Sequence, residues 1–244
     1  MVRPASSTCF ERILKRRNER ENVLDNGLIN INGDSVQTLD IIILMTVISL
    51  IPMMVVMMSS FTRYVISLSF LRNAMGTQQS PPNMVLVGLA LFLTLFTMGP
   101  VIEQIQTDAY TPYVEEEITQ EEFFTRAQVP LKHFMVRNTD SSAIRLYCNM
   151  GGYDMPADEA EGAELPLRVL IPAFMTSELK RGFQIGFFLY LPFLLIDVVV
   201  STTLMAMGMV MLPPAMISTP FKLLFFISLN GWELVFSELV RGFH

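Results

Sequence analysis

The sequence predicts an all-α membrane protein made of two long helical hairpins with a small helical domain between them. Charged residues are segregated along the 244-residue chain and leave three blocks almost free of charge, at 41–62, 84–102 and 183–221. About 20 consecutive apolar residues suffice to cross a bilayer, whereas a soluble domain scatters its charges along amphipathic elements. Glycine and proline pairs between the blocks are typical of turns between helices.

Residues 1–38 are expected to form a polar segment before the first hairpin. Basic residues gather there, at Arg12, Lys15, Arg16, Arg17 and Arg20. A signal peptide would follow such residues with an apolar run and a small-residue cleavage site. Neither follows, so we interpret the segment as flexible or locally structured and not as a cleaved signal.

The first hairpin is predicted for residues 39–102. Its uncharged spans are residues 41–58 and 84–102. Pro52 should kink or break the first span, and Pro100 should break the second, because proline removes a helical hydrogen bond. An amphipathic helix lies between them, and Gly76 with the following Pro81-Pro82 should end it and force the turn.

Residues 103–182 differ from both hairpins, since they hold 14 acidic against 7 basic residues. We expect a small helical domain here. Thr119 and Glu122 fit a capping box, in which each side chain bonds the backbone N–H of the other residue. The helix that they open should end at Pro130. Short helices over 131–137 and 141–150 and an acidic loop up to residue 166 should follow.

The distribution of positive charge predicts the orientation of the chain in the membrane. The segment 63–83 contains two arginines and no acidic residue, and Lys222 follows the second turn. Both turns are therefore expected on the cytoplasmic side, which makes the acidic domain 103–182 extracytoplasmic.

The second hairpin is predicted for residues 183–244. Its first 39 residues, Phe183 to Phe221, contain a single charged side chain, Asp197. We expect a long apolar helix, a methionine-rich bend at residues 205–211, and a return helix that starts near Pro220.

Asp197 requires an explanation, because a charge at mid-membrane costs at least about 2.5 kcal/mol without a partner or a wet cavity. Lys222 is the candidate partner. The two residues lie at similar depth if the hairpin turns between Met209 and Val210, and they cannot pair if it turns at Pro213. A structural ion pair and a proton-carrying role for Asp197 both stay open at this point.

Two further patterns in this hairpin indicate contacts with other helices or copies. Methionines alternate at the bend, at Met205, Met207, Met209 and Met211. Thioether side chains are flexible, so they either fill a helix interface or close an opening while yielding to varied partners. Gly182 and Gly186 form a GxxxG pattern, which permits close helix packing and suggests homo-oligomers.

The sequence predicts neither an enzyme nor a cofactor or metal site. Cys9 and Cys148 are too few for a disulfide framework or a cysteine metal site, and His133 and His244 form no HExxH-type pair. No nucleophile–base spacing is recognisable. No basic stripe with interleaved aromatic residues indicates nucleic-acid binding.

Three segments, 60–96, 118–135 and 171–226, resemble the FliP/SctR family of flagellar and virulence type III secretion proteins. The most specific motifs are PAFMTSELK at Pro172–Lys180 and LPPAMISTPFK at Leu212–Lys222. The resemblance implies a core subunit of the flagellar protein export gate, located in the bacterial inner membrane at the flagellar basal body.

The resemblance also implies how such a subunit works. Family members form a homopentamer that assembles with smaller subunits of the FliQ and FliR families into a helical channel for unfolded flagellar proteins. A methionine gasket closes that channel, and it maps onto Met209, Val210 and Met211. Valine at 210 departs from the methionine usual in the family, and residues 1–38 depart from its usual cleavable signal peptide.

Two hypotheses from different functional classes follow. The first is a non-enzymatic gate subunit that conducts proteins. The second is a proton-coupled membrane transporter that uses Asp197 as its carrier. Transporters are often built from inverted repeats, and the two hairpins share no obvious sequence, so the gate subunit is favoured.

Overall fold

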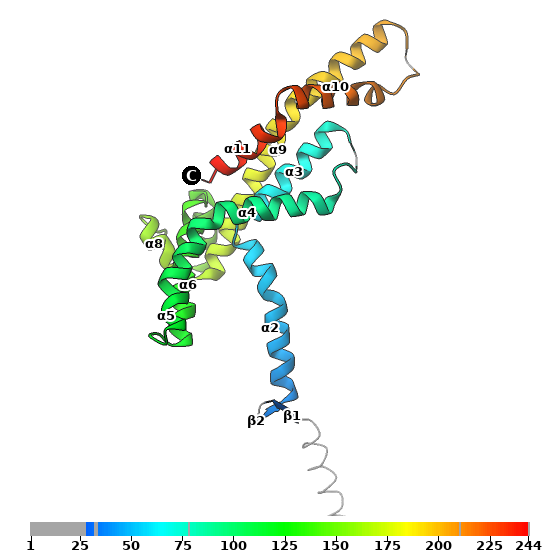
Figure 1. The fold of residues 1–244 in the computed structure, drawn as a ribbon. Coiled ribbons are helices and arrows are strands. Elements are labelled where there is room, and N and C mark those ends of the chain that lie inside the picture. The colour runs from blue at the N-terminus through cyan, green and yellow to red at the C-terminus, as the bar shows by residue number, and fades with distance from the viewer. Residues whose placement is uncertain (1–27, 32–33, 78, 210, 244) are drawn as a thin grey trace, which may run out of the picture. The chain divides into compact units, whose positions relative to one another are not determined.

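The computed structural model describes residues 28–31, 34–77, 79–209 and 211–243, and Figure 1 shows their helices. Contacts divide the chain into two compact units, Met1–Met54 and Val55–His244. Throughout its described part, the larger unit contains helices and the turns between them, which confirms the predicted all-α class.

The smaller unit contains a short β-hairpin, which the sequence did not predict. Strand β1 (Leu28–Ile31) pairs antiparallel with β2 (Asp34–Gln37). Helix α2 (Thr38–Met57) follows and continues through Pro52, so of the kink or break expected there, the break does not occur. The basic cluster at residues 12–20 lies outside the described residues.

The first hairpin of the larger unit consists of α3 (Phe61–Met75) and α4 (Asn83–Ile105). As predicted, α3 ends at Gly76, whose φ of 73° lies in the left-handed region that glycine adopts without strain. The predicted break at Pro100 is wrong, because α4 continues through it. Met98 and Val101 are buried beside Pro100, so packing holds the helix where local preference would end it.

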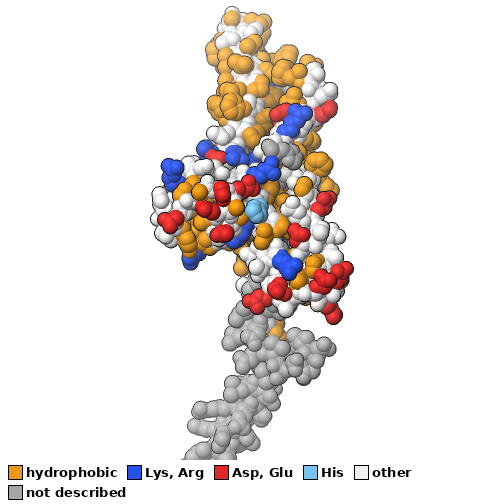
Figure 2. Space-filling view, turned by 90° about the vertical axis from the view of Figure 1, so that its left-hand side faces the viewer, with side chains coloured by type: hydrophobic (Ala, Val, Ile, Leu, Met, Phe, Trp, Pro, Cys, Tyr) orange, Lys and Arg blue, Asp and Glu red, His pale blue; other side chains and the backbone are white. Residues whose placement is uncertain are grey.

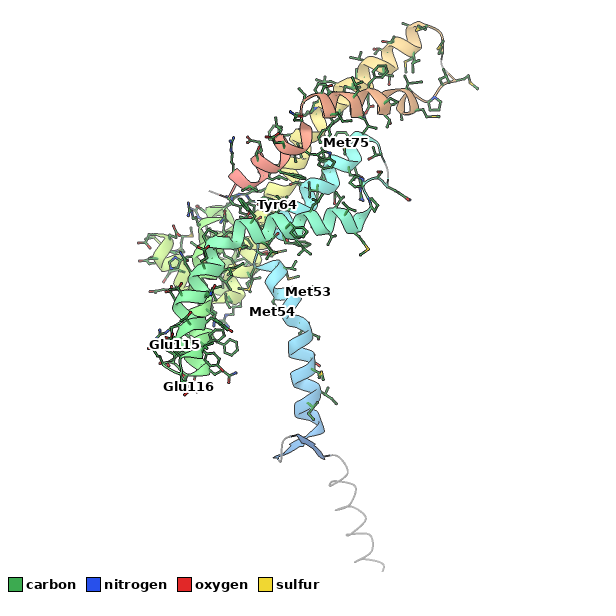
Figure 3. The ribbon with its side chains drawn as sticks, viewed as in Figure 1. Met53, Met54, Tyr64, Met75, Glu115 and Glu116 are labelled. Carbon is green, nitrogen blue, oxygen red and sulfur yellow. The ribbon has the colours of Figure 1, made fainter. Side chains whose placement is uncertain are left out.

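A short π-helical segment, η1 (Gln106–Tyr110), and α5 (Thr111–Val114) lead from α4 into the acidic domain. Glu115 and Glu116 lie at the turn that follows α5 (Figure 3). Helix α6 (Gln120–Arg137) then begins with the predicted capping box. The Glu122 N–H lies 3.3 Å from Thr119 Oγ1, and the Thr119 N–H donates to Glu122 Oε2 at 2.9 Å.

Two expectations for the acidic domain are wrong. Helix α6 does not end at Pro130, which is buried within it, so one helix replaces the expected two. Helix α7 (Ser141–Gly151) follows as predicted. The expected loop contains α8 (Glu159–Glu164), which forms because the Asp158 carboxylate accepts a hydrogen bond from the Glu161 N–H at 2.9 Å and caps the helix.

Helix α9 (Leu167–Ala206) is 40 residues long and joins the acidic domain to the second hairpin without a break. Pro172 and Pro192 both lie inside it. The return helix was expected to start near Pro220. Helix α10 (Pro214–Ser228) instead begins six residues earlier, at Pro214. Helix α11 (Gly231–Arg241) follows after a turn at Asn230.

The main hydrophobic core is organised around α3, which contacts α4, α9 and α10. Its buried face contributes Tyr64, Leu68, Leu71, Ala74 and Met75. The Tyr64 hydroxyl also bonds the Thr97 hydroxyl of α4. Figure 3 labels Tyr64 and Met75 on α3. This core therefore joins the two hairpins within one chain.

Gly182 and Gly186 lie where α9 packs tightly against α3. A Cβ added at Gly186 would lie 2.5 Å from Cγ of Phe70, and one added at Gly182 would lie 3.1 Å from Cγ2 of Ile66. Both neighbours belong to α3 of the same chain. The structure thus shows the GxxxG pattern in an intramolecular contact, whereas the sequence suggested packing between copies.

The large unit exposes extensive apolar surface. Among the described residues, two helical segments are long and apolar enough to cross a membrane, Asn83–Val114 and Leu167–Ala206. A third span is present if Pro214–Ser228 and Gly231–Arg241, which are bent by 66°, count as one. Figure 2 shows hydrophobic side chains covering the end of the unit that carries the second hairpin, and charged side chains gathered farther down. These features are those of a membrane protein.

Gly186→Ala should lower the thermal midpoint of the detergent-solubilised protein, because the added methyl group collides with Phe70. Overpacking of this kind costs about 1–3 kcal/mol. Gly88→Ala on α4 is the matched control, since a Cβ there meets nothing within 4 Å. Alanine favours a helix by about 1 kcal/mol over glycine, so the control should keep or raise the midpoint. Equal shifts in both variants would contradict the close α3–α9 contact.

Candidate functional site

A buried ion pair between α3 and α9 forms the base of the second hairpin. The Arg63 Nε–H donates to Glu178 Oε2 at 2.8 Å, and a second guanidinium nitrogen bonds the other carboxylate oxygen. The two side chains are 1% and 0% exposed. A bidentate arginine–carboxylate pair is both strong and directional, so it fixes the rotation of α3 against α9.

The same guanidinium holds the end of the described chain. Arg63 Nη1 donates to the Gly242 carbonyl oxygen at 2.8 Å, and the guanidinium carbon lies 3.5 Å from the centroid of the Phe243 ring. The Phe243 ring is buried and stacks on Phe134 of α6. Helix α11 is thereby tied back onto α3 and α6.

Sequence reasoning missed this pair, although both residues lie in segments that carry the family resemblance. A signal was present. Arg63 and Glu178 each belong to a helix face that is otherwise apolar or small, and a charge on such a face needs a partner. The sequence alone does not indicate which charged residues of the chain pair with each other.

A second polar cluster lies next to the first and joins α9 to the start of α7. Asp140 bonds Lys180 Nζ at 2.7 Å and an Arg181 nitrogen at 3.0 Å. Its backbone N–H donates to Ser177 Oγ at 2.9 Å. The Lys180 ammonium, with Arg181 adding to it, holds the pKa of the Asp140 carboxyl below its ordinary value, against the opposing effect of partial burial.

The structure brings Asp197 and Lys222 together. Lys222 Nζ lies 2.6 Å from Asp197 Oδ2, and it also donates to the Ala74 carbonyl oxygen at 3.0 Å. Helix α9 ends at Ala206 and α10 begins at Pro214, so the turn is centred on residue 210. The sequence left two turn positions open. The structure shows the one that lets Asp197 and Lys222 pair.

The methionine-rich bend is the free end of the second hairpin. Met211 is 96% exposed and Met209 is 43% exposed. Gly208 has a φ of 76°, which lets the chain turn sharply after α9. Val210, the third predicted gasket residue, lies outside the described residues. Within one chain, Met211 is left uncovered and Met209 is partly covered.

An apolar groove of about 620 Å³ lies between α9 and α10, below the bend. Its lining is Leu195, Ile196, Val199, Val200, Thr203, Leu204, Ile217, Phe221 and Phe225. The one hydroxyl in this lining, on Thr203, donates to the Val199 carbonyl oxygen of its own helix at 2.8 Å. The groove is therefore suited to apolar groups and offers no free donor.

Glu178→Gln should destabilise the protein by about 3–5 kcal/mol, because it leaves the Arg63 charge buried without its partner. The double variant Arg63→Met with Glu178→Met should lose much less, since no charge remains buried. Unfolding of both variants in detergent, followed by circular dichroism, tests this expectation. A double variant as unstable as the single one would show that the unpaired buried charge does not cause the destabilisation.

Asp140 should make the stability of the acidic domain depend on pH. Because its folded pKa is lowered, its contribution is present above the ordinary value of 3.8 and is lost as the pH falls through the folded pKa. The contribution is about 1 kcal/mol or less, since Lys180 is half exposed. The difference in thermal midpoint between wild type and Asp140→Asn should therefore be constant near pH 7 and shrink below pH 3.8. A difference that persists in acid would refute the assignment.

Comparison with known proteins gives a consistent result over most of the chain. A model of the FliP family matches residues 44–239. The flagellar biosynthetic protein FliP of Aquifex aeolicus (strain VF5) is 47% identical over 212 residues, which cover 86% of this chain and 88% of that protein. The flagellar biosynthetic protein FliP of Bacillus subtilis (strain 168) is 44% identical over 223 residues, covering 89% of this chain and 100% of that protein. The chain belongs to the FliP family.

Proposed function

We propose that this protein is a non-enzymatic subunit of the flagellar protein export gate in the bacterial inner membrane. Several copies, five by the family resemblance, would surround a channel together with smaller subunits of the FliQ and FliR families. The channel would conduct unfolded flagellar proteins. The observation that carries the proposal is the exposed methionine bend at the free end of a long apolar hairpin.

The bend supports a gate because its methionine side chains are exposed within one chain. Met211 is almost fully exposed, and Met209 is about half exposed. Tips from several copies arranged around one axis would bury these thioethers against each other. Thioethers are flexible and polarizable, so they close an irregular opening and yield when a chain passes. Met209 and Met211, with Val210 between them, are the proposed gasket.

The outer surfaces of the hairpins support assembly with partners. Phe92 and Phe96 on α4 and Phe187 and Phe188 on α9 are all exposed. Apolar surface of this extent on one chain marks a contact with lipid or with other subunits. An oligomer in which neighbouring copies cover these faces would remove the surface from water.

The described residues support a structural role over chemistry. Within them, no group of three histidine, cysteine or acidic side chains is placed to hold a metal ion. The buried acid Glu178 is paired with an arginine, and Asp197 is paired with a lysine. These pairs hold helices together, which is the task expected of a channel wall.

The alternative, a proton-coupled transporter with Asp197 as the carrier, requires that Asp197 release and take up protons. Its bond to Lys222 at 2.6 Å supports a structural role in the hairpin instead. The two functions differ in the expected result for Asp197→Asn. A proton carrier would lose transport without leaking, whereas a wall residue would loosen the closed channel.

Replacing both Met209 and Met211 with alanine should make the assembled complex leak ions at rest, because the shorter side chains no longer meet across the axis. The measurement is ion or dye release from vesicles that contain the complex with its co-expressed neighbours. Met150→Ala on α7, another exposed methionine, is the control and should stay tight. Unchanged permeability of the double variant in fully assembled complexes would refute the proposed gasket.

A further inference from the structure

Lys222 lies where three helices meet, at the base of the free methionine bend. We propose that Lys222 is the positioning residue of the gate: its ammonium group ties α9, α10 and α3 together and so fixes where Met209 and Met211 lie. This inference rests on the proposed function, because it assigns the residue that holds the proposed gasket in place.

The ammonium makes two bonds to two different helices. It lies 2.6 Å from Asp197 Oδ2 on α9 and donates to the Ala74 carbonyl oxygen of α3 at 3.0 Å. The last four carbonyls of a helix have no partner inside that helix, and a cation there also interacts favourably with the helix dipole. One group on α10 therefore neutralises an acid on α9 and caps α3. We call Asp197, Lys222 and the Ala74 carbonyl the Lys222 junction.

The Lys222 junction lies at the level where the buried part of the second hairpin ends. From 198 to 217, none of the described residues is buried, whereas Phe193 on α9 and Ser218 on α10 are. The C-terminal turn of α3 meets α10 at the same level, where a Cβ added at Gly76 would lie 3.1 Å from Thr219 Oγ1. Beyond this level the described residues of both arms are exposed or only partly covered within the chain.

The arms above the junction are nearly equal in length. At 1.5 Å per residue, roughly 15 Å of chain separate Asp197 from Met207, and roughly 12 Å separate Pro214 from Lys222. A slip of one arm by one residue would move it by about 1.5 Å and turn its side chains by about 100°. Such a slip would change which groups the bend presents, so the junction determines the position of the gasket.

The junction requires a cation with several donors. Lys222 is only 5% exposed, and a buried ammonium is unfavourable unless it is paired and hydrogen-bonded. An ammonium has three donors, of which these two bonds use two. Methionine would fill the volume of the side chain without any donor. Arginine would keep the charge and several donors.

The test measures leakage at rest from vesicles that contain the complex assembled from the full chain and its co-expressed neighbours. Lys222→Met removes both bonds and should raise leakage about tenfold or more, the factor given by the loss of one charge-assisted hydrogen bond. Lys222→Arg should stay nearly as tight as wild type. Lys180→Met, which removes a lysine of α9 that pairs with Asp140 at the start of α7, is the matched control and should not leak.

Asp197→Asn adds a milder variant, because it keeps an acceptor for the lysine and leaves the bond to Ala74 intact. Its leakage should lie between wild type and Lys222→Met. If Lys222→Met fails to assemble, the Asp197→Asn complex provides the test. Leakage above wild type supports the proposal, and leakage equal to wild type overturns it. A tight Lys222→Met complex, or a Lys222→Arg complex that leaks as much, would also overturn it.

The methionine double variant, measured in the same vesicles, separates the two proposals. Leakage from that variant together with tight Lys222 variants overturns the positioning role and leaves the gate in place. Tightness of the methionine variant overturns the gate itself, and with it the role assigned to Lys222.

Discussion

The bidentate pair between Arg63 and Glu178 is the constraint on which the rest of the larger unit depends. Both charges are buried, so each is tolerable only while the other is in place. The pair sets the rotation of α3 against α9, and the guanidinium extends the same constraint to the Gly242 carbonyl and the Phe243 ring. With that rotation fixed, the small residues of α9 face the aromatic and β-branched side chains of α3, and the two helices can approach closely.

Helix α9 carries three ion-paired groups in sequence, and each binds a different part of the molecule. Glu178 holds α3, Lys180 and Arg181 hold Asp140 at the start of α7, and Asp197 holds Lys222 on α10. From Gly182 to the end of the helix, Asp197 is its single charged residue. A continuous 40-residue helix with such contacts connects the acidic domain to the methionine bend, so the bend is positioned by groups that lie several turns away from it.

Polar and apolar groups have different structural roles in this protein. Inside the chain, ion pairs and hydrogen bonds specify which helix faces meet, because burying a charge without its partner is strongly unfavourable. Outside, phenylalanine and methionine side chains on α4, α9 and the bend are left without cover. This arrangement suits a subunit whose fold is specified internally and whose outer surface is completed by lipid and by neighbouring subunits, as proposed for the export gate.

The sequence by itself determined what depends on neighbouring residues or on composition. The all-α class followed from the charge-free blocks, the capping box from Thr119 and Glu122, and the end of α3 from Gly76. It was wrong where tertiary packing outweighs local preference, as at Pro100 and Pro130, which lie inside continuous helices. Only the tertiary structure paired Arg63 with Glu178 and chose between the two registers of the hairpin. Those outcomes depend on which faces meet in space, and buried charges that are 115 residues apart in sequence leave no local pattern that names their partner.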